Sequence, residues 1–201
     1  MPRLLLGTSN EPKAREYSAL FADLPLELTT LDREGIDVVV SETGATYAEN
    51  ATLKAVAYAS LSRLTSLADD SGLEVEALGG EPGPKSARYA GEEATNESRI
   101  RYLLSKLDGV PWQKRKAYFK CVIAIATPEG MAELCYGECE GIMTFEPKGE
   151  GGFGYDPIFY LPELGKTMAE LSLAEKNKIS HRAQAAREAR RVLERLIGGV
   201  W

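Results

Sequence analysis

Residues 116–145 read KAYFKCVIAIATPEGMAELCYGECEGIMTF and decide the fold class. Two long strand candidates, Lys116–Ala126 and Met131–Phe145, flank the turn residues Pro128-Glu129-Gly130, so we expect a β-hairpin. The rest of the chain alternates strands with helices, which is typical of α/β proteins. A hairpin in such a chain predicts a mixed rather than a purely parallel sheet.

Shorter elements are expected on both sides of the hairpin. Their hydrophobic spacing predicts strands at Arg3–Gly7, Leu26–Leu31 and Thr65–Ala68. Four helices are expected: one at 12–22, one from the capping box at Thr46 to about Leu64, one that begins after Thr95 and one that begins near Ser180. Residues 147–157 are expected to form a Gly-rich loop. The strand at Thr65–Ala68 is expected to run into a turn, Asp69-Asp70-Ser71-Gly72. With no repeat and no long linker, we expect a single domain over residues 1–201.

Composition restricts the class of partner. The 201 residues hold 24 Lys+Arg against 30 Asp+Glu, a formal charge of −6, which argues against a protein that binds nucleic acid polymers by broad phosphate neutralisation. The longest apolar run, Cys121–Ala126, has six residues, whereas a membrane helix needs about 20. The start of the chain lacks the length of a signal-peptide core. We therefore expect a cytoplasmic protein with no membrane partner.

The three cysteines, Cys121, Cys135 and Cys139, are accompanied by one histidine, His181. This set does not support a zinc site, and an odd number of cysteines without a secretion signal makes a disulfide framework improbable. The cysteines are expected to be structural.

The first candidate for chemistry is the strand-to-helix turn Thr8-Ser9-Asn10-Glu11-Pro12-Lys13. Backbone N–H groups at a helix start attract phosphate, and Lys13 adds a positive charge. Taken alone, the turn is better explained by Asn10 acting as an ordinary helix cap.

The second candidate is the acidic segment Asp69-Asp70, which follows an apolar strand. Ligands of α/β sheets gather at the carboxyl ends of strands. Successive strand residues point to opposite faces, so only one carboxylate is expected to face a site unless the turn redirects both. Glu42 could join Asp70 as the carboxylate pair that Mg²⁺ takes beside substrate phosphates. The alternative for Asp69-Asp70 is an acidic turn without function, and the alternative for Glu42 is an acidic residue of a surface loop.

The third candidate is Gly151-Gly152-Phe153-Gly154-Tyr155-Asp156-Pro157, where glycines permit close approach of a ligand and aromatic rings can stack on a base. A Gly-rich turn that buries two aromatics is the alternative. The fourth is Glu175-Lys176 with Ser180-His181-Arg182, in which a lone His at a helix start is usually a capping or packing residue.

Together these segments resemble one family. The set consists of Thr8-Ser9-Asn10-x-x-Lys13, Glu42-Thr43-Gly44 with Glu49-Asn50-Ala51, Ala68-Asp69-Asp70-Ser71-Gly72, Ser86-Ala87-Arg88-Tyr89, Gly152-Phe153-Gly154-Tyr155-Asp156-Pro157 and Glu175-Lys176 with Ser180-His181-Arg182. In this order they are similar to the inosine triphosphate pyrophosphatase family, the non-canonical purine nucleoside triphosphate (XTP/dITP) diphosphatases. The resemblance spans Leu4 to about Leu196.

The resemblance implies an elongated mixed α/β fold of two lobes with a central nucleotide-binding cleft, a homodimer, and Mg²⁺-dependent hydrolysis of ITP, dITP and XTP to the monophosphate and pyrophosphate. Carried over by position, residues 8 to 13 (Thr8, Ser9, Asn10, Glu11, Pro12 and Lys13) would hold the triphosphate. Asp70 would be the general base, Glu42 and Asp70 would hold the metal, and Ser71 would contact substrate. The base and sugar would be bound by Phe153, Gly154, Tyr155, Asp156 and Lys176, and His181 with Arg182 would read the purine.

Two departures from the family pattern stand out, Ser9 where Gly is common and Glu11-Pro12 beside Lys13. Glu11 brings negative charge to a phosphate subsite, whereas Pro12 is tolerated in a first helical turn. Three rival readings are a pyrophosphatase for modified pyrimidine or canonical nucleotides, a nucleotide sensor without turnover, and a purely structural interaction domain. The interaction domain leaves the polar loops unexplained. The acids Glu42, Asp69 and Asp70 argue against the sensor, because they hinder triphosphate binding unless a metal is recruited.

Overall fold

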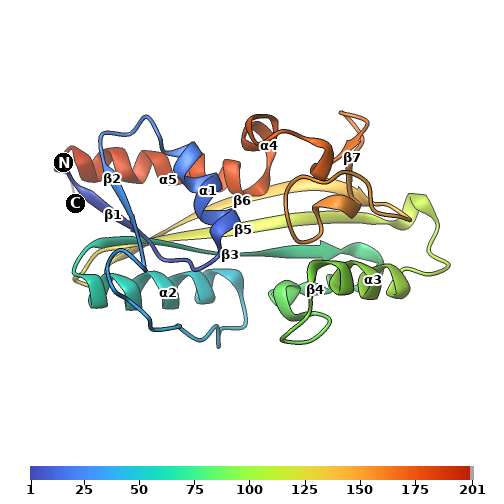
Figure 1. Ribbon diagram of the computed structural model, residues 1–201, viewed down its shortest axis with the longest axis horizontal. Coiled ribbons are helices and arrows are strands. Elements are labelled where there is room, and N and C mark those ends of the chain that lie inside the picture. Colours follow the sequence, from blue (N-terminus) through green and yellow to red (C-terminus); the bar gives the residue numbers. More distant parts are fainter. Residues whose placement is uncertain (200–201) are drawn as a thin grey trace. The chain divides into compact units, whose positions relative to one another are not determined.

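The computed structural model describes residues 1–199 (Figure 1). The chain divides into two compact units. Unit 1 comprises Met1–Asp70, Cys121–Gly137 and the segment from Arg182, and unit 2 comprises Ser71–Lys120 and Glu138–His181. Each unit is therefore assembled from separate stretches of the chain.

Unit 1 is built on parallel strands. β1 (Arg3–Leu6) pairs in parallel with both β2 (Glu27–Thr30) and the first part of β3 (Thr65–Val75). The helices of this unit are α1 (Glu11–Leu20), α2 (Tyr47–Ser62) and, from its second residue onward, α5 (His181–Ile197). Parallel strands need crossover connections, and α1 and α2 supply them.

Alternation along the strands of unit 1 sends side chains to two separate cores. Leu67 packs with α1 and α5, whereas Ala68, the next residue, packs with the alanines of α2. Val122 and Ile123 divide between the two cores in the same way. Helices α1 and α5 accordingly lie on one side of these strands and α2 on the other (Figure 1).

Unit 2 has its own buried core. It contains the end of β3, β4 (Pro82–Gly83), α3 (Asn96–Lys106), β7 (Phe159–Leu161), β8 (Lys166–Thr167) and α4 (Leu173–Ile179). Leu73 and Val75 of β3 pack with Leu103 of α3 and with Phe159 of β7. The pairs β3–β4 and β7–β8 are antiparallel, and so is the pair of β7 with β6 (Ala132–Met143). Single 3₁₀ turns lie at Glu76–Leu78, Ser86–Arg88, Trp112–Lys114, Asp156–Ile158 and Met168–Glu170.

The predicted hairpin is present as β5 (Lys116–Ala126) and β6 (Ala132–Met143). Its turn is closed by a hydrogen bond from the N–H of Thr127 to the carbonyl of Met131, and Gly130 takes a φ of 89° that favours glycine. Over residues 1–199 the strand order is β2-β1-β3-β5-β6-β7-β8, with β4 paired to β3. The sheet combines parallel and antiparallel pairs, so the prediction of a mixed α/β sheet with flanking helices is confirmed.

The predicted helix starts are also confirmed. Thr46 and Glu49 form the capping box of α2, and Thr95 caps α3 through the N–H of Ser98. The predicted end of the third strand is wrong, because Asp69-Asp70-Ser71-Gly72 lies inside β3 rather than in a turn. The strand continues because apolar Leu73 and Val75 resume its alternation and are fully buried in unit 2.

The three cysteines are free and buried. Burial raises the pKa of Cys121 and of Cys135 to about 12 and that of Cys139 to about 11. All three are neutral thiols, as expected for structural cysteines. Among the helices of residues 1–199, none is both long enough and apolar enough to cross a membrane.

Candidate active site

The turn between β1 and α1 carries the first group of predicted site residues. Asn10 is the N-cap of α1, and its Oδ1 accepts a hydrogen bond of 3.0 Å from the N–H of Lys13. The N–H of Asn10 itself donates to Oγ1 of Thr8 at 3.1 Å. Glu11 and Pro12 form the start of the first turn, where proline removes no intrahelical hydrogen bond. Asn10 thus has the capping role that the sequence allowed, and the turn presents a helix N-terminus beside Lys13.

Behind this turn lies a buried ionic group, which we call the Asp69 cluster: Lys13, Glu16, Asp69 and Arg182. Nζ of Lys13 lies 2.9 Å from Oδ2 of Asp69. Arg182 donates from Nη1 to Glu16 at 2.7 Å, and its Nη2 lies 3.7 Å from the same oxygen of Asp69. The cluster joins α1, β3 and α5 within unit 1.

The charges of the Asp69 cluster compensate one another. Burial alone would raise the pKa of Asp69, but Lys13 and Arg182 outweigh it and hold that pKa well below the usual carboxyl value. The pKa of Arg182 is likewise raised against the effect of burial, chiefly by Asp69. Asp69 is therefore ionised at neutral pH, and it holds the ammonium group of Lys13 beside the turn between β1 and α1.

A second polar group lies on the α2 side of β3, and we call it the Asp70 cluster: Glu42, Asn50, Lys54 and Asp70. Nζ of Lys54 donates to Oε1 of Glu42 at 2.5 Å and to the backbone carbonyl of Asp69 at 2.6 Å. Nδ2 of Asn50 donates to Oδ2 of Asp70 at 2.9 Å. The cluster ties α2 and the loop before it to the middle of β3.

Asp70 differs from Asp69 in its electrostatics. Its side chain is buried, and this burial raises its pKa above the ordinary carboxyl value, although Lys54 and the hydrogen bond from Asn50 oppose the rise. Glu42 raises the pKa of Asp70 further, so the two carboxylates interact. A carboxylate with a raised pKa is a stronger base than a solvated one.

The Asp70 cluster fits a magnesium ion better than a zinc ion. Within residues 1–199 there is no group of three or more His, Cys, Asp or Glu side chains that could hold a metal. Two interacting carboxylates, Glu42 and Asp70, are nevertheless the oxygen donors that Mg²⁺ takes when phosphates and waters complete its shell. The imidazole and thiolate ligands that zinc prefers are not part of this cluster.

In unit 2 the Gly-rich segment folds around one carboxylate, forming the Asp156 cluster: Phe153, Asp156 and Lys176. Oδ2 of Asp156 accepts from the N–H of Phe153 at 2.9 Å and from Nζ of Lys176 at 2.5 Å. The ammonium group of Lys176 also lies 4.8 Å from the centre of the Phe153 ring. A Cβ on Gly152, whose φ is +70°, would lie 2.0 Å from Asp156 Oδ2, so glycine is required there.

Other predicted residues of unit 2 make packing contacts and hydrogen bonds. Tyr155 donates from its hydroxyl to the carbonyl of Ser86 at 3.0 Å. The ring of His181 stacks on Phe119 with centroids 4.8 Å apart. Ser71 is half-buried in β3, directly after Asp70. These contacts fix the side chains without assigning them a ligand.

The structure therefore groups the predicted residues within each unit. In unit 1 it gathers Lys13 with Arg182, and Glu42 with Asp70. In unit 2 it gathers Phe153, Asp156 and Lys176. Asp69 and Asp70 face opposite sides of β3, as strand alternation predicts. The catalytic and binding roles of all these residues stay predictions.

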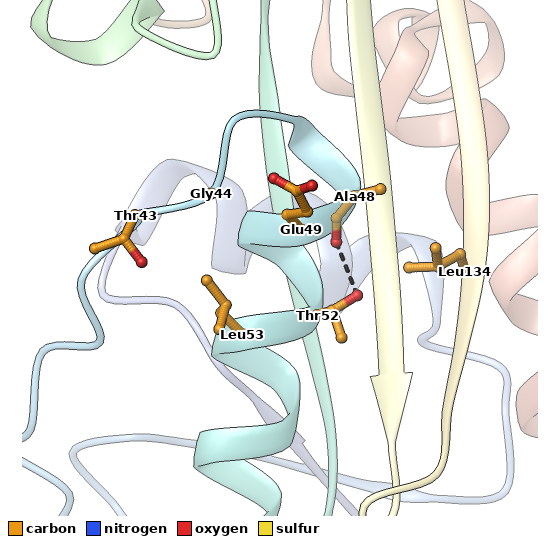
Figure 2. A pocket seen from close by; sticks show the side chains of 7 residues that line it. All are labelled: Thr43, Gly44, Ala48, Glu49, Thr52, Leu53 and Leu134. Atoms are coloured by element: carbon orange, nitrogen blue, oxygen red, sulfur yellow. Dashed lines mark hydrogen bonds between the residues drawn. The ribbon is translucent and has the colours of Figure 1, made fainter.

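A hollow of about 420 Å³ lies along α2 (Figure 2). Its lining consists of short or apolar side chains and a single carboxylate: Thr43, Gly44, Ala48, Glu49, Thr52, Leu53 and Leu134. None of the residues predicted for catalysis or binding lines it. The hollow adjoins the Asp70 cluster at Gly44, whose N–H donates to Oδ1 of Asn50.

Two residues of the clusters were given no role by the sequence. Glu16 forms the buried partner of Arg182, 166 residues away along the chain. Asn50 is fully buried against Asp70. Asn50 could have been noticed in the sequence, because it is a polar residue within the alanine-rich face of α2. Nothing in the sequence indicates that Glu16 pairs with Arg182.

Comparison with known proteins places this arrangement among its relatives. Residues 4–192 match the model of the Ham1 family. The chain is 48% identical over 199 residues to a dITP/XTP pyrophosphatase of Geobacillus kaustophilus, covering 99% of this chain and 98% of that protein. A dITP/XTP pyrophosphatase of Desulforamulus reducens is 46% identical, with 96% of each chain covered. The solved structure of a HAM1 protein from Coxiella burnetii is similar with a TM-score of 0.88 at 41% identity, covering 96% of this chain and 99% of that one.

Proposed function

Because the chain belongs to the Ham1 family, we propose that it hydrolyses the non-canonical purine nucleoside triphosphates dITP, ITP and XTP. The products are the nucleoside monophosphate and pyrophosphate, so the enzyme is a nucleoside triphosphate diphosphatase. The observation that carries this proposal is the 48% identity, over 99% of the chain, with a dITP/XTP pyrophosphatase. The reaction removes these nucleotides from the pool before they enter DNA or RNA.

The phosphates would be held at the β1–α1 turn, Thr8 to Lys13. Three features support this assignment: the N-terminus of α1, the N–H groups around the Asn10 cap, and the ammonium group of Lys13. Asp69 and the exposed Glu11 add negative charge nearby. Lys13 would offset that charge and bind the leaving pyrophosphate.

Asp70 would act as the general base. A water molecule attacks the α-phosphorus, its proton passes to Asp70, and the bond from the α-phosphorus to the bridging oxygen of the β-phosphate breaks. The raised pKa of Asp70 favours acceptance of that proton. Mg²⁺, when held by Glu42 and Asp70, would offset the charge that develops on the phosphate oxygens.

The base and sugar are the part of the substrate proposed for residues of unit 2. Phe153 offers an aromatic face, and the Asp156 cluster fixes Phe153 and Lys176 relative to each other. Gly154, Tyr155 and Ser71 would contribute contacts, and His181 and Arg182 would donate to the 6-oxo group that distinguishes hypoxanthine and xanthine from adenine. In this proposal both units form one domain over residues 1–201.

The assembly and location follow from the same premise. We propose that the enzyme is a cytoplasmic homodimer that acts on small-molecule nucleotides and binds neither nucleic acid polymers nor membranes. The net charge of −6 argues against binding of nucleic acid polymers, which are themselves negatively charged.

One assay tests the function directly. Purified protein is offered dITP, ITP, XTP, dUTP, ATP and GTP, each with and without Mg²⁺, and pyrophosphate and orthophosphate are measured separately. We expect pyrophosphate release, dependent on Mg²⁺, with the highest kcat/KM for dITP, ITP and XTP. Orthophosphate as the first product, or equal rates with ATP, would contradict the proposal.

A further inference from the structure

Asn50 is the polar exception in a helix face that otherwise buries alanine. Ala51, Ala55 and Ala59 of α2 pack against β3 and β5, and Asn50 is fully buried beside them. A buried side-chain amide is costly unless its donor and acceptor groups are both used. The partners of Asn50 therefore show what the residue does.

Those partners fix the direction of the amide. The N–H of Gly44 can only donate, and it lies 2.8 Å from the side-chain oxygen of Asn50. The amide nitrogen is thereby turned toward Asp70, whose Oδ2 it reaches at 2.9 Å. Because a carboxylate accepts and an N–H donates, the reversed amide would lose both hydrogen bonds.

The loop that carries Gly44 is held closely against the start of α2. A Cβ on Gly44 would lie 2.6 Å from Cβ of Glu49 and 2.8 Å from Oδ1 of Asn50, so only glycine permits this approach. The N–H groups of Ala45 and Thr46 both donate to Oε2 of Glu49. Figure 2 shows Gly44 on the loop that enters the helix, next to Glu49. The loop position is thus fixed two residues after Glu42.

From this geometry we propose that Asn50 is a positioning residue for the reaction. Its amide orients the carboxylate of Asp70 and, through Gly44, sets the loop of Glu42 relative to it. The inference rests on the proposed function, in which these two carboxylates act together. An amide is the side chain suited to this task, because an aspartate would accept from Gly44 but repel Asp70, and an alanine would do neither.

Two variants separate the two halves of this role. N50D keeps the acceptor for Gly44 and replaces the donor to Asp70, whereas N50A removes both. T52A is the matched control, because Thr52 lies on the same helix and its hydroxyl donates to the backbone carbonyl of Ala48, one turn earlier in α2. Each variant is measured with dITP and saturating Mg²⁺ for kcat and KM, and by thermal unfolding for Tm.

We expect N50D and N50A to lower kcat by about 10- to 100-fold, the usual effect of removing a partner that orients a ligand carboxylate, while KM changes little. Amide exchange by NMR should show the Gly44 N–H protected in the wild type and N50D and exposed in N50A. T52A should match the wild type in kcat. Unchanged kcat in folded N50D would overturn the proposal, and so would a loss of kcat shared equally by T52A.

A further measurement does not depend on turnover. In ¹⁵N-labelled protein, one side-chain amide proton of Asn50 should exchange slowly with water, and D70A should make it fast while the Gly44 N–H stays protected. Equal exchange of this proton in the wild type and D70A would overturn the inference. Pyrophosphate release by the wild type, assayed alongside, tests the proposed function separately.

Discussion

Asp69 and Asp70 are adjacent on β3, yet their carboxylates face opposite sides of the strand and have opposite electrostatic surroundings. Asp69 is paired with the ammonium group of Lys13 at 2.9 Å, and its pKa is lowered. Asp70 accepts a hydrogen bond from Asn50, and its pKa is raised. The ionised form of Asp69 therefore stabilises the fold, whereas burial of Asp70 disfavours its ionised form. Substitutions at the two positions should therefore have opposite signatures.

Replacing Asp70 by Asn should abolish turnover without weakening the fold. The substitution keeps the size of the side chain but removes the charge that accepts the proton, and loss of a general base costs about 10²–10⁴-fold in kcat. Because burial disfavours the charge of Asp70, D70N should unfold at the same or higher urea concentration than the wild type. Undiminished kcat in folded D70N would rule out Asp70 as the base.

Replacing Asp69 by Asn should chiefly destabilise the protein. Lys13 and Arg182 would lose their shared buried counter-charge, and breaking such a group by removing one partner costs about 3–5 kcal/mol of unfolding free energy. Urea denaturation followed by circular dichroism measures this change. A D69N protein as stable as D70N would contradict the assignment of the two carboxylates.

Removing Glu16 should show how much the buried Arg182 depends on it. E16A leaves a guanidinium that is 1% exposed with one counter-charge fewer, so we expect a loss of about 3–5 kcal/mol in unfolding free energy. D23A is the matched control, because Asp23 is the partner of Arg190 on the surface. The urea midpoint should fall far more for E16A than for D23A. Similar midpoints would show that the buried pair contributes no more than the surface pair.

Alanine at Gly152 should disturb the Asp156 cluster. The new Cβ would lie only 2.0 Å from Asp156 Oδ2, which is too close, so the carboxylate must move away from Phe153 and Lys176. G165A is the control, because Gly165 has a similar φ of +64° but meets only the hydroxyl of Tyr160, at 3.9 Å. Both variants carry the backbone strain of about 1–2 kcal/mol, and G152A should in addition raise KM for dITP. Equal KM values in the two variants would contradict a role of the Asp156 cluster in substrate binding.

Chelation of Mg²⁺ should stop the reaction and leave the fold intact. Two carboxylates form an incomplete shell that depends on substrate phosphates, so the ion is not expected to hold the protein together. EDTA should abolish pyrophosphate release, excess Mg²⁺ should restore it, and the circular dichroism spectrum should stay the same. Full activity after exhaustive chelation would contradict the proposal that Glu42 and Asp70 bind a metal ion needed for the reaction.

Local patterns predicted the fold where they acted over a few residues. The capping residues Thr46 and Thr95 set helix starts, and the Pro128-Glu129-Gly130 turn marked the hairpin, because each depends on neighbours in sequence. The continuation of β3 through Asp69 and Asp70 was missed, since two buried charges look like a turn until their partners are known. Those partners come from α1, α2 and α5.

The clusters were only partly predictable for the same reason. Lys13, Glu42 and Asp70 could be singled out by residue type and by the strand or helix beside them. The Asp70–Asn50 bond spans 20 residues and the Arg182–Glu16 pair spans 166, so both depend on how the chain folds back. The short strands β4 and β8 have two residues each, too few to leave a periodic pattern.

The three buried cysteines give the protein a built-in reporter of unfolding. Thiols with pKa values of about 11 to 12, shielded from solvent, carry almost no thiolate at neutral pH, so alkylating reagents should act on them only when the chain opens. The rate of labelling then measures opening at two places, Cys121 and Cys135 in unit 1 and Cys139 in unit 2. A cysteine introduced on the surface would, by contrast, be modified selectively in the native protein, which allows a fluorophore or spin label to be attached without first removing the native thiols.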